Sequence, residues 1–140
     1  MPYVETSILV AYYCPERLTT RAQGILARQE DVTISPLVHL EVFSAVAKKV
    51  RGHELDVDGA SAIMSTFQLH LQEGRYRWVP IEAREYGLAR NWIGSLSTPL
   101  RTLDALHLAA AFANGLTLLT ADKDLAGAAE HFGVLHELIQ

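Results

Sequence analysis

Short apolar runs and longer amphipathic stretches follow one another along the whole chain. The apolar runs lack clean alternation, which is typical of strands buried on both faces, and they predict strands at 1–5, 32–35, 76–81 and 116–119. The stretch 134–138 is a candidate for one further strand at an edge. Apolar residues at helical spacing predict helices at 7–13, 16–29, 36–50, 56–73, 82–96, 102–114 and 122–132. Strands separated by helices indicate an α/β fold, with a parallel sheet covered by helices on both faces.

Four acidic residues interrupt or end these apolar segments. Glu5 closes the first strand and Asp122 follows the fourth, so both lie at the carboxyl ends of strands, where open α/β sheets bind ligands. Glu41 lies inside the apolar stripe of its helix instead of opposite it. Asp104 and His107 are the only ionisable residues of an otherwise apolar helix. We expect the four carboxylates to converge on one pocket.

Converging carboxylates repel one another and require a cation among them. Oxygen ligands suit Mg²⁺ or Mn²⁺, ions that activate water against phosphate esters. Each acid also has a plainer role that the sequence leaves open. Glu5 could be an exposed strand-end carboxylate, and Glu41 a buried acid satisfied by a neighbour. Asp104 could complement a helix dipole, and Asp122 could cap the next helix. Asp124 is expected to point elsewhere.

The composition fits one domain over residues 1–140, because 49% hydrophobic content in 140 residues allows one sizeable core. The single cysteine, Cys14, can form neither an internal disulfide nor a zinc cluster, so we expect a cytoplasmic protein. The N-terminus has no positively charged leader, and no apolar run reaches the roughly 18 residues of a membrane span. We therefore expect a chain that is neither exported nor membrane-spanning.

The net charge of −4, from 12 basic and 16 acidic residues, by itself argues against a nucleic-acid partner. Divalent ions bound in an acidic pocket would offset part of this charge and would meet substrate phosphates first. Lys48, Lys49 and Arg51 form a local basic stretch, but they also close a predicted helix, where positive charge complements the dipole. The charge alone therefore does not decide the partner.

Four segments, in order along the chain, resemble the signature blocks of PIN-domain ribonucleases: YVETSIL, SPLVHLEVFSAV, LRTLDALHLAAA and LLTADKDLAGAA. The resemblance is strongest to the small VapC-type toxins of toxin–antitoxin pairs. It implies a PIN-like three-layer α/β/α sandwich with a central parallel sheet, an acidic pocket that binds Mg²⁺ or Mn²⁺, and cleavage of RNA. It also implies a cognate antitoxin as partner and pairing into a homodimer.

By this resemblance, Glu41, Asp104 and Asp122 match the acids of the family, and Ser7 and Thr120 match its small hydroxyl residues near the pocket. The remaining acid, however, departs from the pattern.

Glu5 stands where the family usually carries aspartate. The extra methylene displaces the carboxylate by about one C–C bond, in a site where Mg²⁺ coordination at roughly 2.1 Å is exacting. Three outcomes are open: a ligand bridged by water, a preference for a more permissive ion such as Mn²⁺, or lost activity.

Hydrolysis of an RNA phosphodiester is the first functional hypothesis. One ion would lower the pKa of a bound water, and a second would stabilise the leaving oxygen. The expected catalytic metal ligands are Glu5, Glu41, Asp104 and Asp122, and hydrogen-bonding support is expected from Thr6, Ser7 and Thr120. We expect His107 to be a packed and hydrogen-bonded core histidine and do not assign it to the site.

Two other hypotheses belong to different classes. In one, the chain is a binding module that kept the fold but lost the chemistry because of Glu5, and it acts through protein partners. In the other, it is a phosphoacceptor signalling domain. That class needs an aspartate ending a central strand and a lysine ending a later one, and the sequence provides neither.

Overall fold

A computed structural model describes all 140 residues and contains one five-stranded sheet. The strands are β1 (Pro2–Val4), β2 (Val32–Ile34), β3 (Tyr76–Trp78), β4 (Thr117–Thr120) and β5 (His136–Leu138). They are arranged in the order β3-β2-β1-β4-β5, and every neighbouring pair is parallel. The predicted parallel sheet is therefore confirmed, and the candidate edge strand is present as β5.

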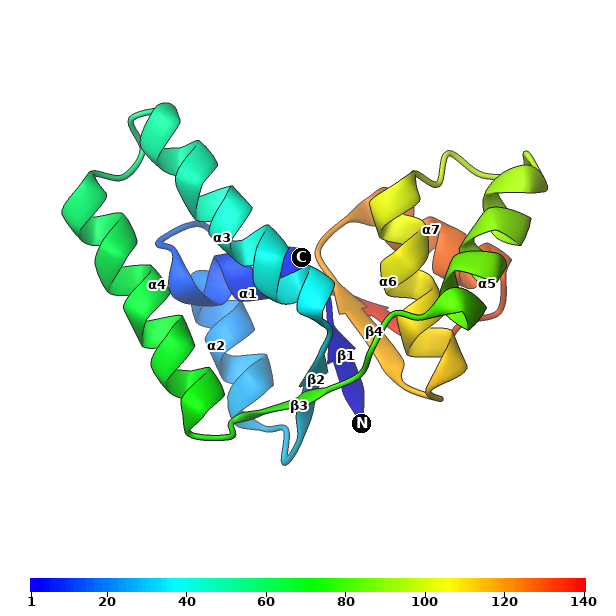
Figure 1. Cartoon of the computed structure of the whole chain (residues 1–140), viewed down its shortest axis with the longest axis horizontal. Helices are drawn as coiled ribbons and strands as arrows, with labels where there is room; N and C mark the ends of the chain where they lie inside the picture. The colour runs from blue at the N-terminus through cyan, green and yellow to red at the C-terminus, as the bar shows by residue number, and fades with distance from the viewer.

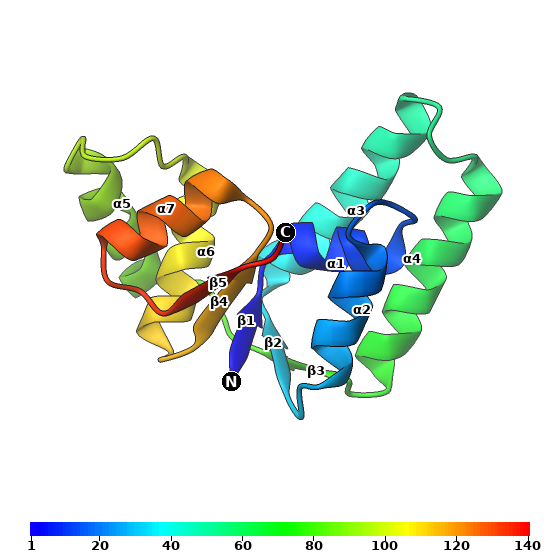
Figure 2. The ribbon, with the colours of Figure 1, turned by 180° about the vertical axis from the view of Figure 1, so that it is seen from behind.

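Seven helices cover the sheet in two layers. One layer consists of α1 (Thr6–Tyr13), α2 (Thr19–Ala27), α3 (Pro36–Arg51) and α4 (Val57–Gln72). The other consists of α5 (Ala83–Gly94), α6 (Thr102–Ala113) and α7 (Lys123–His131). Figures 1 and 2 show the two layers on opposite sides of the strands. The expected three-layer α/β/α arrangement is confirmed.

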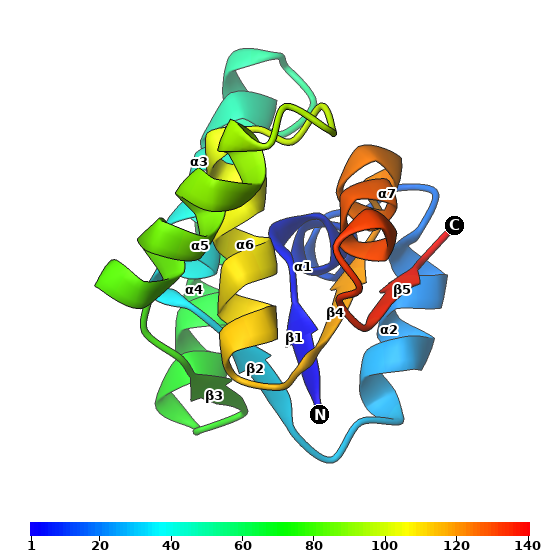
Figure 3. The same ribbon diagram turned by 90° about the vertical axis from the view of Figure 1, so that its right-hand side faces the viewer.

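The direction of the chain across the sheet reverses between β1 and β4. From β1 the chain moves outward through β2 to β3, and it then crosses back to β4 and continues to β5. Figure 3 shows β1 and β4 next to each other, with α1 and α7 above their carboxyl ends and α6 alongside β1. Glu5 follows β1 directly, and its N–H donates to the Leu119 carbonyl at 3.0 Å. This reversal is the point at which open α/β sheets form ligand sites.

Two predicted elements differ at their ends for identifiable reasons. The strand predicted at 76–81 stops at Trp78, because its partner β2 ends at Ile34 and Pro80 has no N–H to continue a ladder. The helix predicted from residue 16 begins at Thr19. There the Thr19 hydroxyl accepts the Glu16 N–H at 2.9 Å and donates to the Cys14 carbonyl at 2.9 Å, which closes a turn before the helix.

The main core lies between the sheet and both helical layers, where 24 buried apolar residues pack together. Helix α6 is buried along most of its length, as its apolar sequence predicted. None of the helices is both long and apolar enough to span a membrane.

Candidate metal centre

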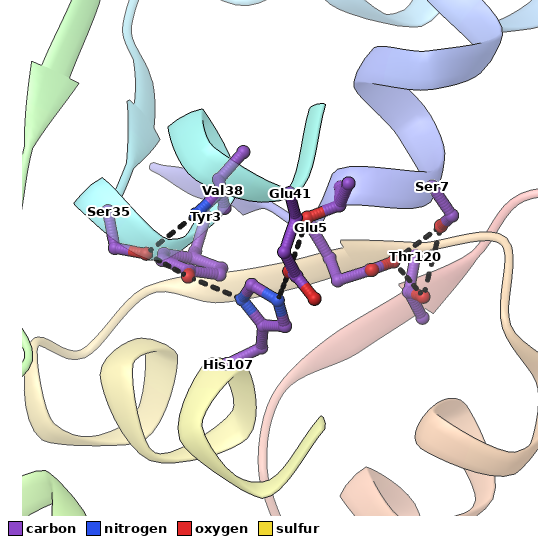
Figure 4. Close-up of polar contacts among 9 residues, drawn as sticks. Tyr3, Glu5, Ser7, Ser35, Val38, Glu41, His107 and Thr120 are labelled. Atoms are coloured by element: carbon purple, nitrogen blue, oxygen red, sulfur yellow. Dashed lines mark hydrogen bonds and ion pairs between the residues drawn. The ribbon is translucent and has the colours of Figure 1, made fainter. Parts of the chain in front are cut away.

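Glu5 is held at the end of β1 through one of its two carboxylate oxygens. The side chain is buried, and Oε2 accepts hydrogen bonds from the Thr120 hydroxyl at 2.8 Å and from the Ser7 hydroxyl (Figure 4). Ser7 lies on α1 and Thr120 ends β4, so residues far apart in the sequence fix this carboxylate. No protein group donates to its Oε1.

Glu41 on α3 is held in the same manner. Its Oε1 accepts a hydrogen bond from the Thr6 hydroxyl at 2.7 Å and another from Nε2 of His107 (Figure 4). Burial by itself would raise the pKa of the Glu41 carboxyl, but the hydrogen bond and charge of His107, together with Thr6, hold the pKa below its usual range. The side chain is 23% exposed, and its Oε2 receives no hydrogen bond from the protein.

Asp122 is the N-cap of α7, so the plainer role that the sequence left open for it, capping the next helix, is observed. Its Oδ1 accepts hydrogen bonds from the N–H groups of Asp124 at 2.8 Å and Leu125 at 3.2 Å. The Asp122 N–H in turn donates to the Thr120 hydroxyl at 3.0 Å. Thr120 thus connects the backbone of Asp122 to the carboxylate of Glu5. Capping uses only one oxygen of Asp122 and leaves Oδ2 without a protein donor.

Asp104 is the exception, because neither of its carboxylate oxygens receives a hydrogen bond from the protein. It lies in the first turn of α6 and is partly buried. Burial, followed by repulsion from Asp122 and Glu5 and a smaller contribution from Glu41, raises the pKa of Asp104 to about 6. His107 acts in the opposite direction but does not cancel these effects. At Asp104, therefore, both burial and repulsion oppose ionisation.

The free oxygens of the four acids are open to solvent. Every buried side-chain nitrogen or oxygen in the chain has a hydrogen-bond partner, so an oxygen without one is not buried. Glu5, Glu41 and Asp122 are therefore each fixed through one oxygen and present the other one. This arrangement suits carboxylates that each give one oxygen to a shared cation.

We expected the four acids to line a single pocket, but in the structure they line two cavities. Glu5 and Glu41 line a cavity of about 480 Å³, whereas Asp104 and Asp122 line a smaller one of about 230 Å³. The cavities adjoin, because Leu103 lines the larger one and Asp104 the smaller. Asp124 was expected to point away, but it too lines the smaller cavity.

The donor chemistry of the group fits a hard divalent ion, since all four side chains offer carboxylate oxygens. Burial and the repulsion of the neighbouring acids, which together raise the pKa of Asp104, are the electrostatic reason for a cation to bind here. As the side chains lie, no three His, Cys, Asp or Glu residues form a group able to hold one ion. Side-chain rotation across the boundary between the two cavities is therefore required to bring three oxygens to a common point.

The sequence of the chain decides its family. A family model described as PIN domain matches residues 3–131, which is most of the chain. The chain belongs to the PIN domain family. The expected resemblance is thereby confirmed at the level of the family, and the five-stranded parallel sheet agrees with it.

Solved structures show the same PIN fold at low sequence identity. A FitAcB structure from Neisseria gonorrhoeae is 21% identical, with a TM-score of 0.73 over 97% of this chain and 96% of the other. VapC20 of Mycobacterium tuberculosis, described as a sarcin–ricin loop cleaving toxin, is 18% identical, with a TM-score of 0.70 over 91% and 95%. A toxin–antitoxin complex from Klebsiella pneumoniae is 20% identical, with a TM-score of 0.67 over 91% and 92%. No curated protein sequence matches the chain.

His107 is the residue of this PIN domain that sequence reasoning left out of the site. It is buried and hydrogen-bonded, as expected of a core histidine, but one of its partners is Glu41. The available signal was its position three residues after Asp104, which places both side chains on similar faces of α6. That spacing did not reveal the contact with Glu41, which lies 66 residues away in the sequence.

Proposed function

We propose that this PIN domain is a divalent-metal-dependent endoribonuclease and acts as the toxin of a toxin–antitoxin pair. The observation that carries the proposal is made at Asp104, where burial and the negative charges of Asp122, Glu5 and Glu41 raise the pKa to about 6. The three charges come from three other segments of the polypeptide and act on Asp104, beside the reversal in strand order. A divalent cation is the partner that would relieve this repulsion.

Glu41, Asp104, Asp122 and, with its longer side chain, Glu5 would hold Mg²⁺ or Mn²⁺. When bound, such an ion supplies a water of lowered pKa and neutralises charge that develops on a phosphate. The other residues act on the carboxylates. Their hydrogen bonds fix one oxygen of each glutamate, so that less side-chain freedom remains to be lost when the second oxygen engages a ligand. These fixing residues are Thr6 and His107 for Glu41, and Ser7 and Thr120 for Glu5.

A basic wall beside the glutamates supports a nucleic-acid substrate. Lys48 and Arg51 line the same 480 Å³ cavity as Glu41, are exposed, and form no ion pair within the protein. Lys49, in contrast, pairs with Glu54 at 3.2 Å. On a helix with a rise of 1.5 Å per residue, Lys48 lies roughly 10 Å along the axis from Glu41. An RNA strand with one phosphate at the acids would thus have cations available for a neighbouring phosphate.

The direct test is RNA cleavage by the native chain with Mg²⁺, with Mn²⁺ and with a chelator, alongside Asp104→Asn. Asp58→Asn is the matched control, because Asp58 also lies in the first turn of a helix but is exposed on α4. We expect cleavage that requires a divalent ion, is lost in Asp104→Asn and persists in Asp58→Asn. Cleavage that is unaffected by the chelator or by Asp104→Asn would contradict the proposal.

An antitoxin partner is part of this proposal, because one similar structure is described as a toxin–antitoxin complex and another as a toxin. A homodimer and a cytoplasmic location are proposed along with it, the latter because the single thiol, Cys14, is buried and forms no disulfide. Co-expression with the product of the neighbouring reading frame should yield a stable complex that no longer cleaves RNA. Light scattering on the purified chain should give twice the mass of one copy. A monomeric mass would remove the dimer from the proposal.

A second candidate is a PIN-fold binding module without catalysis, and Glu5 is the observation that favours it. The longer side chain reaches the Thr120 hydroxyl, 2.8 Å from Oε2, and thereby commits one oxygen to the protein. Glu5→Asp shortens the side chain by one methylene and restores the residue usual in the family. An inert native chain with an active Glu5→Asp variant would establish the binding module. Activity in the native chain would exclude it.

A further inference from the structure

A chain of buried polar side chains lies directly behind Glu41 and has no part in the chemistry proposed above. The Ser35 and Tyr3 hydroxyls are 2.8 Å apart, and the Tyr3 hydroxyl lies 2.7 Å from Nδ1 of His107. All three residues are at most 1% exposed. Figure 4 shows the chain running from the start of α3 through β1 to the His107 ring on α6.

Such a chain is costly in a core that is otherwise apolar. The neighbours of His107 on the buried part of α6 are alanines and leucines. Each buried polar group must keep its hydrogen bonds to avoid a large desolvation cost, and apolar replacements of similar shape are often as stable or more stable. Packing alone therefore does not account for a histidine at this position.

The contact of His107 with Glu41 shows which ring nitrogen carries a proton. Nε2 contacts Oε1 of Glu41, and an ionised carboxylate can only accept, so Nε2 carries the proton. The Tyr3 hydroxyl, which can both donate and accept, pairs with Nδ1 whether or not that nitrogen carries a proton. Burial raises the pKa of Tyr3, so the hydroxyl keeps its proton.

We propose that His107 is a positioning residue for Glu41, with Tyr3 and Ser35 fixing the orientation of its ring. Together with Thr6, which donates to the same oxygen at 2.7 Å, it holds Oε1 so that Oε2 faces the site. These hydrogen-bonded side chains also connect β1, α3 and α6, the elements that place three of the four acids. The role of Glu41 as a metal ligand rests on the proposed function, whereas the contact with His107 does not.

The test compares two amides at position 107. An extended glutamine places its amide nitrogen near the position of Nε2 and can still donate to Glu41, whereas asparagine reaches only the position of Nδ1. The readouts are the affinity for Mn²⁺ alone by calorimetry and the melting temperature without metal. We expect His107→Asn to weaken Mn²⁺ binding by about 10–100-fold and His107→Gln to weaken it by less than about tenfold, with similar melting temperatures.

Tyr3→Phe is a second variant, which keeps the ring volume and removes only the hydroxyl that faces Nδ1. We expect it to remain folded and to weaken Mn²⁺ binding less than His107→Asn does, because the donor to Glu41 remains. Equal losses of Mn²⁺ affinity in His107→Gln and His107→Asn would overturn the proposal. So would unchanged affinity in both variants, because the donor to Glu41 would then have no effect on binding.

Nitrogen-15 NMR of the histidine rings, recorded without metal, separates this inference from the proposed function. We expect a slowly exchanging proton on Nε2 of His107 in the native chain and rapid exchange in Glu41→Ala, which lacks the acceptor. If this proton is present but the native chain neither binds Mn²⁺ nor cleaves RNA, the proposed function fails and the positioning contact stands. If the proton is absent from Nε2, the inference fails whatever the activity.

Discussion

The two glutamates and Asp104 are held by the protein in opposite ways. Glu5 and Glu41 each accept two side-chain hydrogen bonds at one oxygen, and the pKa of Glu41 is held low. Asp104, in the adjoining cavity, accepts none, and its pKa is raised to about 6. The protein thus supplies hydrogen-bond donors to the carboxylates of the two glutamates and supplies none to the carboxylate of Asp104.

This difference indicates where an ion contributes most. A carboxylate that already has donors is stable without a cation, whereas an unsatisfied carboxylate facing three others gains from one directly. The anchored glutamates would define the position of the ion, and Asp104 would contribute most of the electrostatic gain. The metal-free chain would accordingly be strained at Asp104 and not at Glu41.

The largest expected effect is on activity, and it should be equal for substitutions of Glu41 and of Asp104. Glu41→Gln and Asp104→Asn each remove the charge of one proposed metal ligand, so both should lower kcat/KM for RNA by more than about a hundredfold, since metal catalysis is worth several kcal/mol. Cleavage assays at saturating Mn²⁺ provide the measurement. Near-native activity in either variant would remove that residue from the metal centre.

The anchoring hydroxyls should have the next largest effect. Thr120→Val keeps the shape of the side chain but removes the donor to Glu5 and the acceptor of the Asp122 N–H, so we expect Mn²⁺ affinity to fall by about 10–100-fold. Thr66→Val is a suitable control, because the exposed Thr66 hydroxyl bonds only to the Ala62 carbonyl of α4. Equal Mn²⁺ affinity in the two variants would show that the anchor at Glu5 does not matter.

Without metal, substitutions of Asp104 and of Glu41 should change the melting temperature in opposite directions. Near neutral pH, Asp104→Asn removes a repelled charge and should raise the melting temperature by a few degrees, whereas Glu41→Gln removes a stabilised charge and should lower it. Calorimetry or circular dichroism measures both. Changes of the same sign would contradict the comparison.

The pH dependence of these changes follows from the direction of each pKa shift. The folded pKa of Asp104, about 6, lies above its ordinary value of 3.8, so the folded chain binds more protons between these pH values and loses stability as the pH rises through them. The gain from Asp104→Asn should therefore be complete above pH 6 and mostly absent at pH 4. The stabilisation by Glu41 has the opposite dependence, because it is present above the ordinary pKa of 4.5 and is lost as the pH falls through the lowered one.

The smallest expected effect concerns the basic wall. In an Asp104→Asn background that leaves RNA intact, Lys48→Gln and Arg51→Gln should each reduce the slope of log affinity against log salt by about 1. Lys49→Gln, one residue along the same helix but paired with Glu54, is the matched control and should change the slope less. Equal slopes for all three variants would mean that RNA does not follow this wall.

Much of the fold could be predicted because its signals are local. The apolar runs and helical stripes located every strand and helix, and the helix predicted at 36–50 is observed as α3 over Pro36–Arg51. The errors lie where an element depends on a partner. Strand β3 is short because β2 ends at Ile34, and no pattern within residues 76–81 contains that information.

The candidate site could be predicted in its residues but not in its arrangement. Glu41 stood out because an acid inside an apolar stripe needs a partner, and that partner proved to be His107. The division of the acids between two cavities could not be read from the sequence, because each cavity is lined by segments that are far apart in the chain.

The sequence by itself determined the parallel α/β class and the four acids beside the reversal in strand order, since hydrophobic periodicity and strand ends are properties of neighbouring residues. Only the tertiary structure decided which carboxylate oxygens are fixed and which are free. Those contacts join residues up to 115 positions apart, as between Glu5 and Thr120, and depend on side-chain torsions that packing selects. For the same reason the role of His107 became visible only when α6, β1 and α3 were seen together.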